Sequence, residues 1–78
     1  MRTIQAIVDE LEDAGLFLVD HMVGSLGEHE LYFTTSGGYA IQDVDLDEAY
    51  DIASMYAAVN VYEAYHQGED VIVVDVTL

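Results

Sequence analysis

The sequence contains no cysteine and no lysine, and its single basic residue is Arg2. Without cysteine, the chain can form neither a disulfide nor a thiolate metal site. Sixteen acidic residues give a net charge of −15 at pH 7, so one arginine cannot pair with most of them. Nucleic acids and anionic membranes should repel this chain, because binding to either relies on Lys and Arg. We therefore expect no direct nucleic-acid partner and no membrane partner.

Targeting and membrane-spanning signals are absent as well. The chain begins with Met1, Arg2 and Thr3 and continues into an amphipathic segment, so we expect no signal peptide. No stretch approaches the roughly 18 consecutive apolar residues of a membrane span, and we expect a cytoplasmic protein. The hydrophobic content of 53% argues against disorder. A length of 78 residues predicts a single domain, residues 1–78.

Motifs for catalysis and metal binding are also missing. The chain has no phosphate-binding glycine loop and no Gly-x-Ser-x-Gly elbow. The segment around His29, Glu-His-Glu, lacks the ligand spacing of a structural metal site. The acids from Asp43 to Asp47 resemble the start of a calcium loop, but Glu48 stands where that loop needs glycine. We predict no enzyme, no cofactor and no metal site; a loose cation site at these acids is the alternative.

Hydrophobic periodicity predicts two helices and four strands. The first helix, over residues 3–14, places Ile4, Ile7, Val8 and Leu11 on one face. The second helix is expected to have Asp45 as N-cap, with Glu48 completing a capping box, and to end at Gly68 after about 21 residues. The predicted strands cover residues 16–23, 30–35, 39–42 and 71–78.

The resulting order, α-β-β-β-α-β, predicts an α+β fold. Three consecutive strands joined by short turns should form an antiparallel meander, and both helices should cover one face of the sheet. The last strand is apolar on both faces in its first half, from Val71 to Val74. It is therefore expected either inside the sheet or at an edge open to another chain. The expected product is a two-layer domain.

The acidic residues gather on two segments, which we predict to be partner-binding surfaces. On the first helix they face solvent; around the start of the second helix they follow one another closely. In an extended stretch, Asp43, Asp45 and Asp47 would project on one side about 6.8 Å apart, and Asp51 would continue the row at helical spacing. The predicted acidic binding residues are Asp9, Glu12, Asp13, Asp43, Asp45, Asp47, Glu48 and Asp51.

The second half of the predicted long helix carries tyrosine where a surface helix would carry charge. Tyrosine offers flat apolar area and a hydroxyl at low entropic cost. The alternatives are a helix buried on two sides, or a few exposed aromatic residues without a role. We predict instead a contact surface for a partner or for a symmetric dimer, formed by Tyr50, Val61, Tyr62 and Tyr65.

A row of fixed negative charges presents to a basic groove what a phosphate backbone presents, since duplex DNA carries one charge per about 1.7 Å of axis. In size, charge, initial helix, strand meander and acidic helix entry, the chain resembles the small acidic DNA-mimic inhibitors encoded by phages and mobile elements, which include anti-CRISPR proteins. This resemblance implies an inhibitory protein–protein interaction, in the host cytoplasm if a phage encodes the chain. The expected partner is a basic nucleic-acid-binding protein.

Two other interpretations of the acidity remain open. The chain could be an immunity or antitoxin-like partner of a basic toxin, in which case the physics is the same and the target is an active site. It could instead be an acidic cytoplasmic protein of a salt-adapted organism, whose charge serves solvation and mimics nothing. Such proteins are expected to carry more than one arginine and a leaner apolar content.

Overall fold

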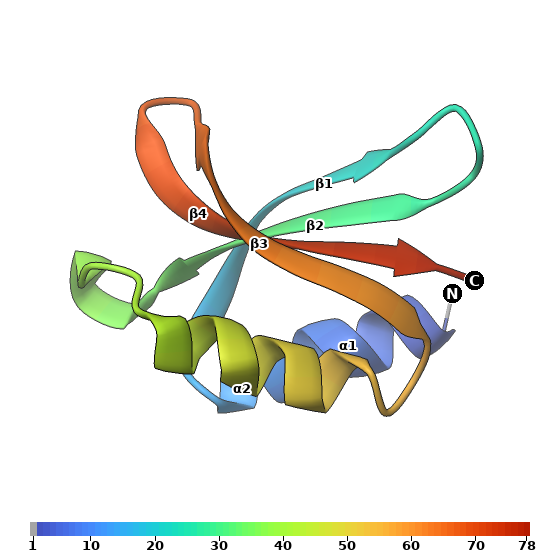
Figure 1. Cartoon of the computed structure of the whole chain (residues 1–78), viewed down its shortest axis with the longest axis horizontal. Helices are drawn as coiled ribbons and strands as arrows, with labels where there is room; N and C mark the ends of the chain where they lie inside the picture. The colour runs from blue at the N-terminus through green and yellow to red at the C-terminus, as the bar shows by residue number, and fades with distance from the viewer. Residues whose placement is uncertain (1) are drawn as a thin grey trace.

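The computed structural model describes residues 2–78, which form two α-helices and four strands (Figure 1). Two strands follow the first helix, and two more follow the second. A short 3-10 turn, η1, joins the first pair of strands to the second helix. In chain order the elements are α1 (Arg2–Asp13), β1 (Leu16–Val23), β2 (His29–Thr35), η1 (Ser36–Gly38), α2 (Asp43–Ala53), β3 (Ala58–His66) and β4 (Glu69–Thr77).

The strands form one antiparallel sheet in the order β1-β2-β4-β3, and the two helices lie together on one face of it (Figure 1). The predicted α+β class, with an antiparallel sheet and both helices on one face, is confirmed. The predicted order of elements is wrong, because the chain runs α-β-β-α-β-β.

Residues 39–42 were predicted to be a strand, but they lie outside the sheet. The predicted meander would have placed them beside β2. In the structure that side of β2 pairs with β4, from His29 opposite Val76 to Phe33 opposite Ile72. The segment instead leads from the sheet into the helix layer, and Tyr39 remains 77% exposed.

The predicted long helix is also wrong, because α2 ends at Ala53 and residues 58–66 form the edge strand β3. Val59 and Val61 pack against the core between the sheet and the helices, while Asn60 and Tyr62 point to the other face. This alternation has the period of a strand, and Val and Tyr favour strands. Pairing with β4 along its whole length, from Ala58 opposite Thr77 to His66 opposite Glu69, stabilises β3.

The start of α2 differs from the prediction by one turn. Gln42 is the N-cap, and Asp45 occupies the third helical position. The two residues form a capping box, in which the Gln42 backbone N–H donates to Asp45 Oδ2 at 2.9 Å. Asp45 therefore still satisfies an unpaired backbone donor at the helix start, from inside the helix.

The core lies between the helices and the sheet. The predicted apolar face of α1 is confirmed, since all four of its residues are buried. On α2 the buried residues are Ala49 and Ala53, whose small side chains allow the helix axis to approach the sheet. The sheet contributes Leu16, Leu31, Phe33, Ile72, Val74 and Val76.

The face of the sheet away from the helices is also partly closed. Val71 and Val73 alternate with the core residues of β4 and so point to this open face, yet they are 0% and 1% exposed. No helix covers them in the part of the chain that the structure describes (Figure 1). The sheet is twisted so strongly that its two hairpins curve over this side, as expected for antiparallel ribbons with a bulge; the bulge lies in β1 between Leu18 and Asp20. We call this side the concave face.

A two-residue turn, Gln67-Gly68, joins β3 to β4, and both residues have positive φ angles, of 52° and 84°. This is the type I′ geometry that suits hairpin twist.

We expect Gly68→Ala to lower the free energy of unfolding by about 1 kcal/mol, because a Cβ strains this conformation, and no atom lies within 4 Å to clash with it. Gln67→Asn should raise stability, because asparagine tolerates positive φ. Urea denaturation measures both; equal stability of Gly68→Ala and the wild type would contradict the turn.

Candidate functional site

The acidic residues of α2 lie in a row on its solvent face. Asp43, Asp47 and Asp51 are exposed and spaced four residues apart, which places successive residues about 6 Å apart along the helix axis. The predicted extended row through Asp45 is wrong, because these residues are helical and the Asp45 carboxylate caps the helix. Glu48 is exposed on the flank of α2.

The acids of α1 lie in the same layer. Asp9, Glu12 and Asp13 are exposed on α1, which packs beside α2 under the sheet (Figure 1). A hydrogen bond from the Tyr56 hydroxyl to Glu10 Oε1, at 2.5 Å, ties α1 to the segment that follows α2. This bond raises the pKa of Tyr56, because it stabilises the neutral phenol. The structure thus brings both predicted acidic groups to one surface, the outer face of the helix layer.

The predicted tyrosine surface on one long helix is wrong, because its residues lie on different elements. Tyr50 is half exposed on α2, whereas the other three residues belong to β3. Val61 faces the helices and is partly buried, Tyr62 lies on the concave face, and Tyr65 is 74% exposed near the end of the strand. The contact surface for a partner or a dimer at these four residues stays a prediction.

The concave face carries a second group of polar residues that sequence reasoning missed. Strand register places Glu30 of β2 opposite Asp75 of β4, which lies opposite Asn60 of β3. The neighbouring row joins Tyr32, Val73 and Tyr62 in the same way. Only the β2–β4–β3 pairing brings these residues together. One signal was visible in the sequence, since Asp75 is the one charge within the apolar run from residue 71 to residue 76.

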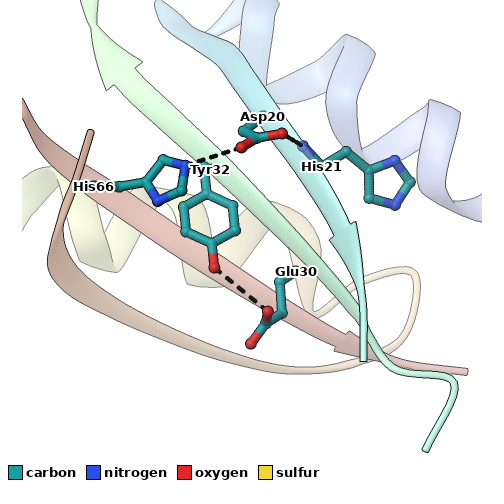
Figure 2. Close-up of polar contacts among 5 residues, drawn as sticks. All are labelled: Asp20, His21, Glu30, Tyr32 and His66. Atoms are coloured by element: carbon teal, nitrogen blue, oxygen red, sulfur yellow. Dashed lines mark hydrogen bonds and ion pairs between the residues drawn. The ribbon is translucent and has the colours of Figure 1, made fainter. Parts of the chain in front are cut away.

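A hydrogen bond joins the two edge strands across this face (Figure 2). The His66 Nε2 of β3 and Asp20 Oδ2 of β1 are 2.9 Å apart, although two strands lie between them in the sheet. The His66 ring also packs on Tyr32, with ring centroids 4.3 Å apart. The bond from His66, helped by the backbone N–H of His21 at 2.8 Å, lowers the pKa of Asp20. The contact shows how far the sheet curls.

The tyrosines of the concave face lie close to its acids. The Tyr32 hydroxyl donates a long hydrogen bond to Glu30 Oε1, at 3.4 Å (Figure 2). Desolvation and the charge of Glu30 raise the pKa of Tyr32, and desolvation with the charges of Glu30 and Asp75 raises the pKa of Tyr62. Asp75 Oδ1 is buried and has no hydrogen-bond partner among the described residues. Both phenols are therefore neutral at pH 7. Among residues 2–78, Glu30 and Asp75 form no ion pair.

A pair of histidines lies elsewhere on the first hairpin. The ring nitrogens of His21 and His29 are 2.9 Å apart, which is a hydrogen bond between two imidazoles. Within residues 2–78, no three or more His, Cys, Asp or Glu side chains gather in a way that could hold a metal ion. A shallow pocket of about 390 Å³ opens beside the β3–β4 turn; its hydroxyl-bearing residues include Thr35, which donates to the Tyr39 carbonyl oxygen.

Comparisons with protein-family models, with curated protein sequences and with solved structures give no match to this chain. Across the described residues, no helix has the length and apolar character needed to cross a membrane. The function must therefore be argued from the chemistry of the helix layer and of the concave face.

The Asp20–His66 contact predicts a specific pH dependence. Because the pKa of Asp20 is lower in the folded state than its ordinary value of about 3.9, its stabilising contribution is present above that value and is lost as pH falls through the folded-state pKa. We expect Asp20→Asn to lower the free energy of unfolding at pH 6, and this deficit to shrink toward pH 3.

Asp47→Asn, which removes an exposed acid from the outer face of α2, is the control for the loss of one charge. Urea denaturation of the wild type and both variants between pH 6 and pH 3 makes the comparison. A deficit for Asp20→Asn that stays constant over this range, or that matches the effect of Asp47→Asn, would contradict the assignment.

Proposed function

We propose that this protein is an acidic inhibitory binding protein that occupies the basic nucleic-acid-binding surface of a target, as DNA mimics of the anti-CRISPR type do. The observation that supports the proposal most is the row of Asp43, Asp47 and Asp51 along the outer face of α2. This row places three carboxylates over about 12 Å, on a rigid element. Acids on the neighbouring helix widen it into an acidic surface.

The charge density of this surface is lower than that of DNA. One α2 charge per about 6 Å of helix axis compares with one per about 1.7 Å in duplex DNA. Asp9 and Asp13 on α1 raise the density of the layer, and no lysine anywhere in the chain offsets it. Such a surface attracts a basic groove over a distance and raises association rates at low salt.

The experiment compares two triple charge reversals that change the net charge equally. One reverses the α2 row, Asp43→Lys with Asp47→Lys and Asp51→Lys; the control reverses three exposed acids of the second hairpin, Glu63→Lys with Glu69→Lys and Asp70→Lys. The wild type, immobilised at low salt, captures its partner from a host-cell lysate. We expect the α2 variant to lose capture and the hairpin variant to retain most of it.

Nucleic-acid mimicry predicts how the captured partner is released. Duplex DNA or RNA should displace it, and 0.5 M salt should release it, because exposed charges are screened over a few ångströms at that ionic strength. Single changes of the row to Asn should each cost roughly 0.2–1 kcal/mol. A partner that stays bound at high salt and keeps its nucleic-acid affinity would refute the proposal. A partner whose blocked surface is the active site of a basic toxin would support the immunity-protein alternative.

A further inference from the structure

The concave face holds two like charges directly opposite each other. Glu30 and Asp75 are register partners on the central strands β2 and β4, and like charges at such positions destabilise a sheet. Asp75 also interrupts the otherwise apolar run from residue 71 to residue 76, and its Oδ1 is buried without a partner among the described residues. A buried acceptor without a partner costs free energy. The arrangement therefore lowers the stability of the isolated protein, and a bound cation would remove that cost.

The groups around these carboxylates favour a particular cation. Tyr32 and Tyr62 lie in the adjacent row, on either side of the buried Val73, so two phenol rings border the acids. The tyrosines are neutral and supply hydrogen bonds but no positive charge. The one arginine of the chain, Arg2, begins α1 in the helix layer on the opposite face. Within residues 2–78 neither Glu30 nor Asp75 forms an ion pair, so a counter-charge from another molecule would complement them.

We propose that the concave face binds the guanidinium group of an arginine side chain from the target, between Glu30 and Asp75 and against the tyrosine rings. A guanidinium is planar, donates in a fork that matches carboxylates, stacks on aromatic rings and is more weakly hydrated than an ammonium. A lysine ammonium would lose more hydration energy here and would gain less from the rings. The inference rests on the proposed basic target and adds a short-range arginine site to the long-range attraction of the helix layer.

The site can be tested without the target. N-acetyl-L-arginine amide is titrated into the ¹⁵N-labelled protein, with N-acetyl-L-lysine amide and sodium chloride as matched arms, and amide chemical shifts are followed. We expect saturable shifts at Glu30, Tyr32, Tyr62 and Asp75 with the arginine compound, and several-fold weaker binding of the lysine compound. Shifts confined to the helix layer, or equal for both compounds, would overturn the inference.

Two variants separate the site from general acidity. Asp75→Asn should weaken binding of the arginine compound at least about tenfold, because it removes a charge-assisted hydrogen bond. Glu63→Gln, with the same change in charge at an exposed residue of β3 that lies outside the concave face, should leave it unchanged. Asp75→Asn should also raise the melting temperature, since the repulsion with Glu30 disappears. Unaltered affinity, or a lower melting temperature, in Asp75→Asn would show a structural role instead.

The two proposals fail in different ways. Target capture that still depends on salt and on the α2 row, together with no arginine binding at the concave face, overturns this inference alone. Specific arginine binding at Glu30 and Asp75, together with target capture that ignores both salt and the α2 row, overturns nucleic-acid mimicry alone.

Discussion

The structure depends on the place of β4 at the centre of the sheet. Five of the six residues from Val71 to Val76 are buried, and the burial extends to both faces of the strand. A strand buried in this way needs a neighbour on each side, and β2 and β3 supply them. By taking the free side of β2, β4 excludes the segment at residues 39–42 from the sheet. By offering its other side, it holds residues 58–66 as a strand.

The same pairing gives the molecule two different acidic surfaces. The helices cover one face and carry exposed carboxylates on rigid elements, which act over a distance. The other face curls until β1 and β3 meet through Asp20 and His66, and this curvature shelters the apolar residues of β4 without a helix. Glu30 and Asp75 on that face are partly buried, in contrast to the exposed carboxylates of the helices.

The elements set by local pattern could be predicted from the sequence. The first helix, its buried face, the first two strands and the last strand all follow from short-range periodicity and glycine positions, and the structure confirms them. The prediction of a helix over residues 58–66 was wrong, because the mixture of Ala, Val and Tyr in this segment also fits one face of a helix. An acidic start near Asp45 and a glycine at Gly68 then looked like the two ends of one helix. Their strand conformation comes from pairing with β4, which no local window contains.

The candidate sites divide in the same way. Helix periodicity predicted that the acids of α1 and α2 are exposed. It did not predict that α2 begins at Asp43, so the spacing of the acids in the α2 row was predicted wrongly. The concave face could be predicted only by knowing which strands pair and in what register, since Glu30 and Asp75 are 45 positions apart in the sequence. The local sign in the sequence was the single charge, Asp75, within the apolar run from residue 71 to residue 76, because a charge is costly to bury.

β3 is an edge strand whose end curls over the sheet to reach β1. The nuclear Overhauser effect spectrum of the folded protein tests this arrangement. We expect contacts between the ring protons of His66 and Tyr32 and between the His66 ring and the β protons of Asp20, with strong sequential Hα–HN contacts through residues 58–66. Strong sequential HN–HN contacts through that segment, with no contact between His66 and β1, would show a helix and contradict this arrangement.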